Sequence, residues 1–275
     1  MSSSSSASPA LRILAPDEPP AFEVVNPEGR SSAVLLCDHA SNAVPRSLPE
    51  LGRQHEALRE HTGWDIGAAR LSRRLSALLD APLVLSGYSR LVIDCNRPLG
   101  SPTSIPEISC GVPIPGNTID AAEARARADA CFWPYHRAIT ALLDARRDRR
   151  ERTAILSMHS FTPAMPGQDR PWHAAVLYGR DRRLAAPFLE ALRREPGLCV
   201  GDNEPYRVTE GGDYGIPTHG EARGLPCVLL EIRQDGLLTD EGVEAWAQRL
   251  AASYRAIEAS GVDLSALSPD AAAGR

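Results

Sequence analysis

The sequence predicts an α/β fold with three layers, in which helices cover a mixed, mostly parallel sheet. Two observations lead to this fold class. Short apolar runs alternate with longer amphipathic stretches, and hydrophobic residues make up 43% of the 275 residues, enough for a sizeable core. Because α/β chains of this length often have one core, we expect a single domain over residues 21–266. The Ser-, Pro- or Ala-rich ends, 1–20 and 267–275, are expected to be disordered tails.

The individual elements follow from the pattern of apolar residues. Each apolar run is short enough for a buried strand, and each amphipathic stretch has the periodicity of a helix. Pro134 lacks a backbone N–H, so we expect it to kink or break its helix. Thr239 is a suitable N-cap, and the two acidic residues after it favour the helix dipole. The predicted strands are 33–37, 83–85, 91–93, 154–158, 174–177 and 227–230, and the predicted helices are 65–79, 120–150, 181–194 and 239–257.

Three long segments rich in glycine and proline are predicted loops. Loops of this length inside a compact domain often form lids or the walls of a pocket, although simple tolerance of insertions explains them equally well. They cover residues 98–118, 161–172 and 202–226.

The charge of the chain favours a small-molecule partner. The formal net charge of −5 gives no general attraction to phosphate backbones, so we expect no nucleic-acid partner. All thirty cationic side chains are arginines, and the absence of lysine excludes Schiff-base chemistry and a P-loop. Arginine binds carboxylates through two parallel hydrogen bonds. A small carboxylate is therefore the expected substrate.

Cysteine spacing and hydropathy indicate a cytoplasmic protein without a membrane partner. The six cysteines are scattered and form no C-x-x-C pair, so we expect reduced thiols. The Ser-rich N-terminal run lacks the apolar core of a signal peptide, and no apolar stretch approaches the roughly 20 residues that span a bilayer. The sequence makes no prediction of the oligomeric state.

Polar residues directly follow four of the predicted strands. They are Asp38 with His39, Asp94, His159 and Glu231. In open α/β sheets the carboxyl ends of the strands line the ligand crevice, so these side chains are expected to converge although they are distant in sequence.

The residue types at these strand ends predict a metal-dependent hydrolytic site. His39 and His159 are suitable zinc ligands, and Asp65 could complete a two-histidine, one-carboxylate set that leaves a position for water. Helix capping is the alternative role of Asp65. Glu231 is the expected general acid or base, with a salt bridge to Arg233 as its alternative.

Other charged residues and histidines are candidates for supporting roles. Arg90, Asn96 and Arg97 suit a substrate carboxylate, and we expect one of the two arginines to pair with Asp94. His61 and His219 could either bind the ion or support its ligands. The remaining histidines, His55, His136 and His173, are expected to be structural residues on the surface or on a helix face.

Five motifs, in their order along residues 33–237, resemble the N-formylglutamate amidohydrolases. The resemblance implies a zinc-exopeptidase-like (phosphorylase/hydrolase-like) fold, in which residues 21–266 form one catalytic domain. It also implies zinc, or another divalent metal, on His39, Asp65 and His159, with Glu231 as the catalytic carboxylate. Ala40-Ser41-Asn42 stands where better-known members have a Gly-rich turn, which indicates a divergent branch. The motifs are Asp38-His39, Trp64-Asp65, Ser89-Arg90 to Asp94 with Asn96-Arg97-Pro98, His159-Ser160, and Leu230-Glu231-Ile232-Arg233.

The expected function is metal-dependent hydrolysis of the amide of a small N-formyl or N-acyl amino acid by metal-activated water. Asn96 and Arg97 resemble the element that holds the terminal carboxylate in related enzymes, and Arg90, Arg233 and His219 complete the predicted substrate-binding set. Two rival hypotheses remain. One is a metal-free hydrolase with Ser157, Ser160 or Cys37 as nucleophile, although G-x-S-x-G is absent. The other is a non-catalytic protein that binds a carboxylate ligand on the same fold.

Overall fold

A seven-stranded sheet forms the centre of the computed structural model, which describes residues 11–53, 55–165, 167 and 169–265. The four central strands are parallel, β1 and β7 run antiparallel to the neighbours β3 and β9, and β8 is parallel to β7. This confirms the predicted mixed, mostly parallel sheet. In spatial order the strands are β1 (Phe22–Val25), β3 (Leu83–Ser86), β2 (Ala33–Cys37), β6 (Ala154–Phe161), β9 (Cys227–Arg233), β7 (Ala174–Leu177) and β8 (Val200–Asp202).

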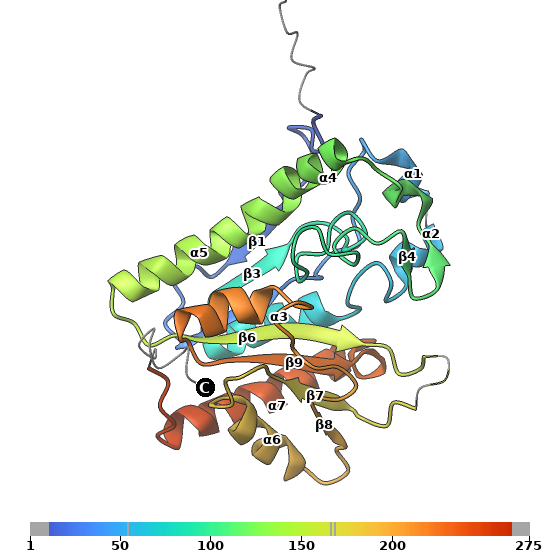
Figure 1. Cartoon of the computed structure of the whole chain (residues 1–275). Coiled ribbons are helices and arrows are strands. Elements are labelled where there is room, and N and C mark those ends of the chain that lie inside the picture. The colour runs from blue at the N-terminus through green and yellow to red at the C-terminus, as the bar shows by residue number, and fades with distance from the viewer. Residues whose placement is uncertain (1–10, 54, 166, 168, 266–275) are drawn as a thin grey trace, which may run out of the picture.

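Helices cover both faces of the sheet, which gives the predicted three layers (Figure 1). On one face lie α3 (Ala68–Leu79), α6 (Ala185–Arg193) and α7 (Asp240–Ala259), and on the other lies α5 (Trp133–Asp148). None of the described helices is long and apolar enough to cross a membrane. The smaller elements are α1 (Pro49–Gly52), α2 (His55–Arg59), α4 (Ala121–Arg127), the hairpin β4 (Ile108–Ser109) and β5 (Val112–Pro113), and the short turns η1 (Pro115–Asn117), η2 (Ala128–Phe132), η3 (Ile216–Gly220), η4 (Glu221–Arg223) and η5 (Gln234–Leu237).

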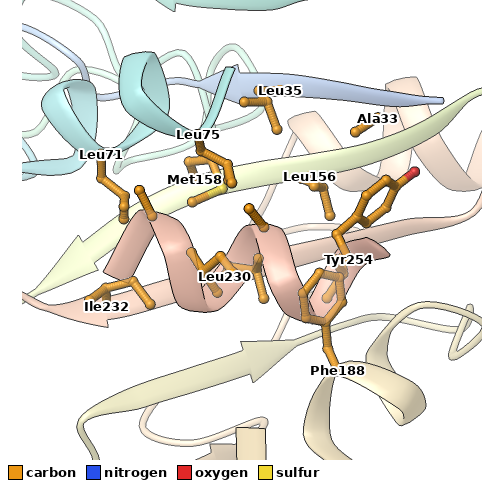
Figure 2. Packing of buried hydrophobic residues seen from close by; sticks show 14 of the residues in the cluster. Ala33, Leu35, Leu71, Leu75, Leu156, Met158, Phe188, Leu230, Ile232 and Tyr254 are labelled. Atoms are coloured by element: carbon orange, nitrogen blue, oxygen red, sulfur yellow. The ribbon is translucent and has the colours of Figure 1, made fainter. Parts of the chain in front are cut away.

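The alternation of side chains along the central strands builds two separate cores. Figure 2 shows Leu156 and Met158 of β6 on the face that packs against Leu75 of α3 and Tyr254 of α7. The opposite alternation, which includes Ile155, packs against α5. Because successive strand residues point to opposite faces, the polar residues at 157, 159 and 231 lie on the α5 side of the sheet.

The predicted strand 91–93 is wrong. These residues form a buried turn, in which the backbone N–H of Leu91 donates to Ser89 Oγ at 3.1 Å and that of Val92 donates to Ser89 O at 2.9 Å. Their apolar side chains pack in a third cluster with Phe132. A short apolar run indicates burial, which a turn can provide as well as a strand. The prediction also missed β1, β8 and the β4–β5 hairpin.

The helical region predicted over 120–150 is continuous, because α4, the π-helical turn η2 and α5 follow one another directly. Pro134 therefore does not break the helix. The wide turn just before it accommodates the residue that lacks a backbone N–H. The Thr239 side chain caps α7 as predicted, by accepting from Gly242 N at 3.1 Å.

The helix predicted to begin at Asp65 begins instead at Ala68, with Gly67 as its N-cap. Asp65 thus precedes the helix, and its carboxylate does not cap it. The predicted domain boundaries stay a prediction. Residues 1–10 and 267–275 of the expected tails lie outside the described residues, whereas Ile13 is buried and its carbonyl accepts a 2.6 Å hydrogen bond from Ser47 Oγ.

Candidate active site

A cavity of about 540 Å³ opens where the carboxyl ends of β2, β6 and β9 meet. All three predicted loops contribute to its wall, for example through Cys110, Thr162 and Tyr206, which confirms their expected role as pocket walls. Its floor contains His39, Asp65, Arg90, His159 and Glu231. The strand ends therefore bring together residues that lie nearly 200 positions apart in the chain.

His39, Asp65 and His159 form a compact donor set. Each offers one ligand atom, and the three atoms lie within 4.8 Å of one another. Asp65 Oδ2 is 3.3 Å from His39 Nδ1 and 2.8 Å from His159 Nδ1. Ligands around a tetrahedral zinc ion, each about 2.0–2.2 Å from the metal, lie about 3.3 Å apart. The donors therefore lie close to the spacing that a divalent cation requires.

Two further carboxylates orient the imidazoles. His39 Nε2 lies 2.7 Å from Asp94 Oδ1, and His159 Nε2 lies 3.2 Å from Asp38 Oδ2. A carboxylate can only accept, so the Nε2–H groups donate to Asp94 and Asp38, and Nδ1 of each ring faces Asp65. There a neutral ring offers its lone pair to a metal ion, and a protonated ring donates to the carboxylate. In either protonation state, a positive charge lies beside the Asp65 carboxylate, carried by a metal ion or by the imidazole protons. This orientation is the one that metal ligands need.

The pKa values of His39 and His159 also show that this pocket favours a positive charge. Burial lowers the pKa of His159, but the hydrogen bonds to Asp38 and Asp65 outweigh it and hold the pKa well above its usual value. Burial and Arg90 likewise lower the pKa of His39, and the carboxylates of Asp94 and Asp65 outweigh them. Either a proton or a metal ion satisfies the electrostatics of this pocket.

Arg90 neutralises the carboxylates next to the donor set. Its Nη2 donates to Asp94 Oδ2 at 2.6 Å, and its Nη1 lies 3.7 Å from Asp65 Oδ1. This confirms the prediction that one of the two arginines pairs with Asp94. The guanidinium also lines the cavity, where it remains within reach of a bound anion.

Glu231 lies beside the donor set, and none of the described residues forms an ion pair with it. It occupies the position on β9 that is directly opposite His159 on β6, and it lines the cavity. Its Oε2 atom is buried and has no hydrogen-bond partner among the described residues. Burial raises the pKa of this carboxyl to about 7. The alternative salt bridge is not formed, because Arg233 Nε donates to Asp235 instead, at 2.9 Å.

A network of loop contacts holds Asn96 and Arg97 at the cavity wall. Arg97 Nη1 donates to Asp213 Oδ1 at 3.3 Å, and Asn96 Nδ2 donates to the same oxygen at 3.1 Å. Asn96 Oδ1 accepts from the backbone N–H groups of Tyr214 at 3.1 Å and Gly215 at 2.9 Å. The Asn96 amide thus links two loops, and Arg97 presents its guanidinium to the cavity.

The other predicted residues divide between the cavity and its surroundings. His61 lines the cavity, and its Nε2 has no hydrogen-bond partner among the described residues. His219 is only 1% exposed and lies behind the wall, where it contacts His136. Arg233 holds the 161–172 loop from outside, by donating to Arg170 O at 3.3 Å.

The three nucleophiles of the rival hydrolase hypothesis are poorly placed. Cys37 is fully buried, which raises the pKa of its thiol. Ser157 lies behind His159, with its Oγ 3.1 Å from Nε2, and Ser160 Oγ donates to Ile66 O at 2.8 Å. The geometry offers none of these atoms as an activated nucleophile facing the cavity.

Sequence reasoning did not assign the orienting role of Asp38 and Asp94, nor any role to Asp213. The first two directly follow buried apolar runs, which is a usable signal. Asp213 lies in a Gly-rich loop, and nothing in its local sequence distinguishes it from a solvated acid.

Comparison with known proteins agrees with this geometry. Residues 31–238 match the family model of N-formylglutamate amidohydrolase. The chain belongs to the N-formylglutamate amidohydrolase family. Membership assigns the protein to the hydrolases, and the predicted fold class is confirmed.

Two solved structures resemble this member of the family. Gene product Atu2144 from Agrobacterium tumefaciens is 33% identical, with a TM-score of 0.87 over 90% of this chain and 99% of that one. The N-formylglutamate amidohydrolase from Ralstonia eutropha JMP134 is 19% identical and shares the fold, with a TM-score of 0.61 over 87% of this chain and 97% of that one. A search of curated proteins found no match.

Proposed function

We propose that this protein is a metal-dependent amidohydrolase that cleaves the amide of a small N-formyl or N-acyl amino acid. The observation that carries the proposal is the buried carboxyl of Glu231, whose Oε2 has no hydrogen-bond partner among the described residues, beside a two-histidine, one-aspartate donor set. The cavity volume of about 540 Å³ suits a small molecule. Membership of the N-formylglutamate amidohydrolase family supports the reaction class.

His39, Asp65 and His159 would hold zinc or another divalent ion. The donor spacing and the orientation of both Nδ1 atoms towards Asp65 support this assignment. When bound there, such an ion supplies a Lewis acid that polarises the acyl carbonyl and lowers the pKa of water.

Glu231 would transfer the proton. Its carboxylate accepts a proton from the attacking water while the water oxygen forms a bond to the acyl carbon. It then delivers that proton to the amide nitrogen as the C–N bond breaks, which yields a free acid and an amine. Burial raises the pKa of this carboxyl, which helps it to return the proton, and a bound cation lowers the pKa, which helps it to accept one.

Arg97 and Arg90 would bind the substrate carboxylate, with Asn96 keeping Arg97 in place. Both guanidiniums line the cavity on the side of the Asp94–Arg97 segment. Each is already paired with an aspartate, so a bound carboxylate adds a second hydrogen-bonded partner to a fixed guanidinium.

Elemental analysis combined with a substrate panel tests the proposal. We expect about one divalent metal ion per chain, and hydrolysis of some N-formyl or N-acetyl amino acids that stops after chelation and returns with zinc. Activity that survives chelation but is abolished by a serine- or thiol-directed reagent would favour the metal-free hydrolase. Tight carboxylate binding by metal-loaded protein that turns over no compound of the panel would favour a non-catalytic binding protein.

A further inference from the structure

Two buried histidines behind the cavity wall form a pair that the proposed chemistry does not use. His136 lies on α5 and His219 on η3, and they are 3% and 1% exposed. His136 Nδ1 lies 2.9 Å from His219 Nε2, and the rings are stacked with centroids 5.1 Å apart. On its other side, His136 Nε2 lies 2.9 Å from the carbonyl oxygen of Cys95.

The direction of these hydrogen bonds is determined by the carbonyl. A carbonyl oxygen can only accept, so His136 Nε2 carries the proton and donates to Cys95 O. In the neutral ring, Nδ1 is then an acceptor, and His219 Nε2 must donate to it. Burial lowers the pKa of His136 to about 4 and that of His219 to about 3, so both rings are neutral at pH 7.

The pair joins the two segments that meet at Arg97. The first segment contains Cys95, which lies between Asp94 and Asn96. The second segment leads to His219, and its backbone N–H groups at residues 214 and 215 donate to Asn96 Oδ1. Asp213, at the beginning of that segment, accepts from Arg97. His136 contacts both segments from α5, which itself packs against the sheet.

We propose that the His136–His219 pair is a positioning element that sets the affinity of the cavity for the substrate carboxylate. It does so by holding residues 94–97 against residues 213–219, which places the guanidinium of Arg97. The catalytic meaning of this inference rests on the proposed amidohydrolase function.

The metal donors and Asp94, which orients His39, have anchors outside the histidine pair. The Asp94 side chain accepts from Arg90 at 2.6 Å, and its backbone N–H donates to Ser104 O at 2.7 Å. His159 lies on the central strand β6. Loss of the pair should therefore weaken carboxylate binding and leave metal content and the chemical step intact.

His219→Leu and His219→Gln separate the hydrogen bond from the packing. The amide nitrogen of Gln can occupy the position of Nε2 and donate to His136, whereas Leu fills a similar volume without a donor. In zinc-loaded His219→Leu we expect a KM about tenfold higher and affinity for L-glutamate, measured by calorimetry, about tenfold lower, the effect of one lost buried hydrogen bond. We expect kcat and zinc content within about twofold of wild type, and His219→Gln close to wild type in all four.

Hydrogen exchange gives a measure that does not depend on activity. The amides of Tyr214 and Gly215 should exchange faster in His219→Leu and retain their protection in His219→Gln. Leu143→Ala, on α5 about 10 Å along the helix from His136, is the matched control, because it removes a buried side chain of the same helix without touching the hydrogen bonds of the pair. Its unfolding temperature should fall while KM and the exchange of the two amides stay unchanged.

The outcomes distinguish this proposal from the proposed function. If His219→Leu matches wild type in amide exchange and L-glutamate affinity, or loses zinc or kcat instead, the positioning role is rejected. If no N-acyl compound is hydrolysed by wild type but the two amides lose protection in His219→Leu, the histidine pair stands and the amidohydrolase proposal fails. Should His219→Leu not fold, His136→Gln, which can keep the donor to Cys95 O, replaces it with the same expected changes.

Discussion

Glu231 lies directly opposite His159 because β9 and β6 pair in parallel and in register at these two residues. The pairing places a carboxyl that has no ion-pair partner in the described part of the chain next to His159 and on the same face of the sheet. The strand register thus determines that the carboxyl beside His159 is that of Glu231. Replacing Ile232, the next residue, would alter the other face and its separate core.

Glu231→Gln should abolish turnover and keep the metal. Gln has the same shape but cannot accept and return a proton, so we expect kcat to fall about 10²- to 10⁴-fold. Metal content, measured by elemental analysis, should not change. Glu241→Gln, in the exposed first turn of α7, is the control and should be fully active. An active Glu231→Gln enzyme would remove Glu231 from the mechanism.

The pH dependence of activity should have an acid limb that belongs to Glu231. Burial raises the pKa of this carboxyl to about 7, and the general base must be deprotonated, so kcat/KM rises as the pH increases through the pKa of Glu231. A bound divalent cation lowers that pKa, because it favours the charged form. Carboxyl ¹³C NMR should therefore find Glu231 titrating near 7 in metal-free protein and lower with zinc. An identical titration in both states would place the ion elsewhere.

Asp38→Asn should weaken metal binding without removing a ligand. The carboxylate of Asp38 accepts from His159 and fixes which ring nitrogen faces Asp65, and loss of such a partner typically costs about 10- to 100-fold in metal affinity. Competition with a zinc chelator measures this. Tyr135→Phe removes only the 2.8 Å hydrogen bond from the tyrosine hydroxyl to Asp38, so its effect should be smaller.

Metal removal should destabilise the folded protein. An ion that binds only the folded state adds about 4.1 kcal/mol at about 1,000 times its Kd. We expect chelation to lower the unfolding temperature of wild type and to leave that of His159→Ala unchanged, as measured by calorimetry. If the unfolding temperature of wild type is the same with and without zinc, His39, Asp65 and His159 are not zinc ligands.

Acid should destabilise the fold through His136 and His219. Burial lowers the pKa of both below the ordinary value of 6.5, so below pH 6.5 the unfolded chain binds protons that the folded protein does not. Their contribution to stability is therefore fully present above pH 6.5 and is lost as the pH falls towards about 4. Each histidine changes the free energy of unfolding by about 1.4 kcal/mol per pH unit in this window.

Chemical denaturation of wild type and of the His136→Gln/His219→Gln double variant measures that slope. The double variant lacks both titrating rings, so its stability should depend less steeply on pH between 4 and 6.5. Equal slopes would mean that neither ring is kept neutral by burial.

The sequence predicted most of the central sheet because buried parallel strands are continuous apolar runs. The segments that became β2, β6, β7 and β9 follow this rule. The run 91–93 is equally apolar, but Ser89 closes it into a turn, so composition alone misassigned it. Edge strand β1, with its partly exposed side chains, carries a weaker apolar pattern and was missed.

The candidate site was predictable where its polar residues directly follow buried apolar strands. The order of the motifs identified His39, Asp65 and His159, and the structure brings one donor atom of each within 4.8 Å of the others. The sequence placed His219 with the substrate-binding residues, whereas it contacts His136 behind the wall. That contact joins residues 83 positions apart, and no local pattern predicts such a pair.

By itself, the sequence determined the residue types of the site and their places at the ends of buried strands, since apolar periodicity and donor chemistry are local properties. Only the tertiary structure decided that Nδ1 of both imidazoles faces Asp65 and that Glu231 has no ion-pair partner among the described residues. These depend on strand register and on loops that meet from distant parts of the chain. Hydrogen bonds act over about 3 Å, so only the packed fold can set them.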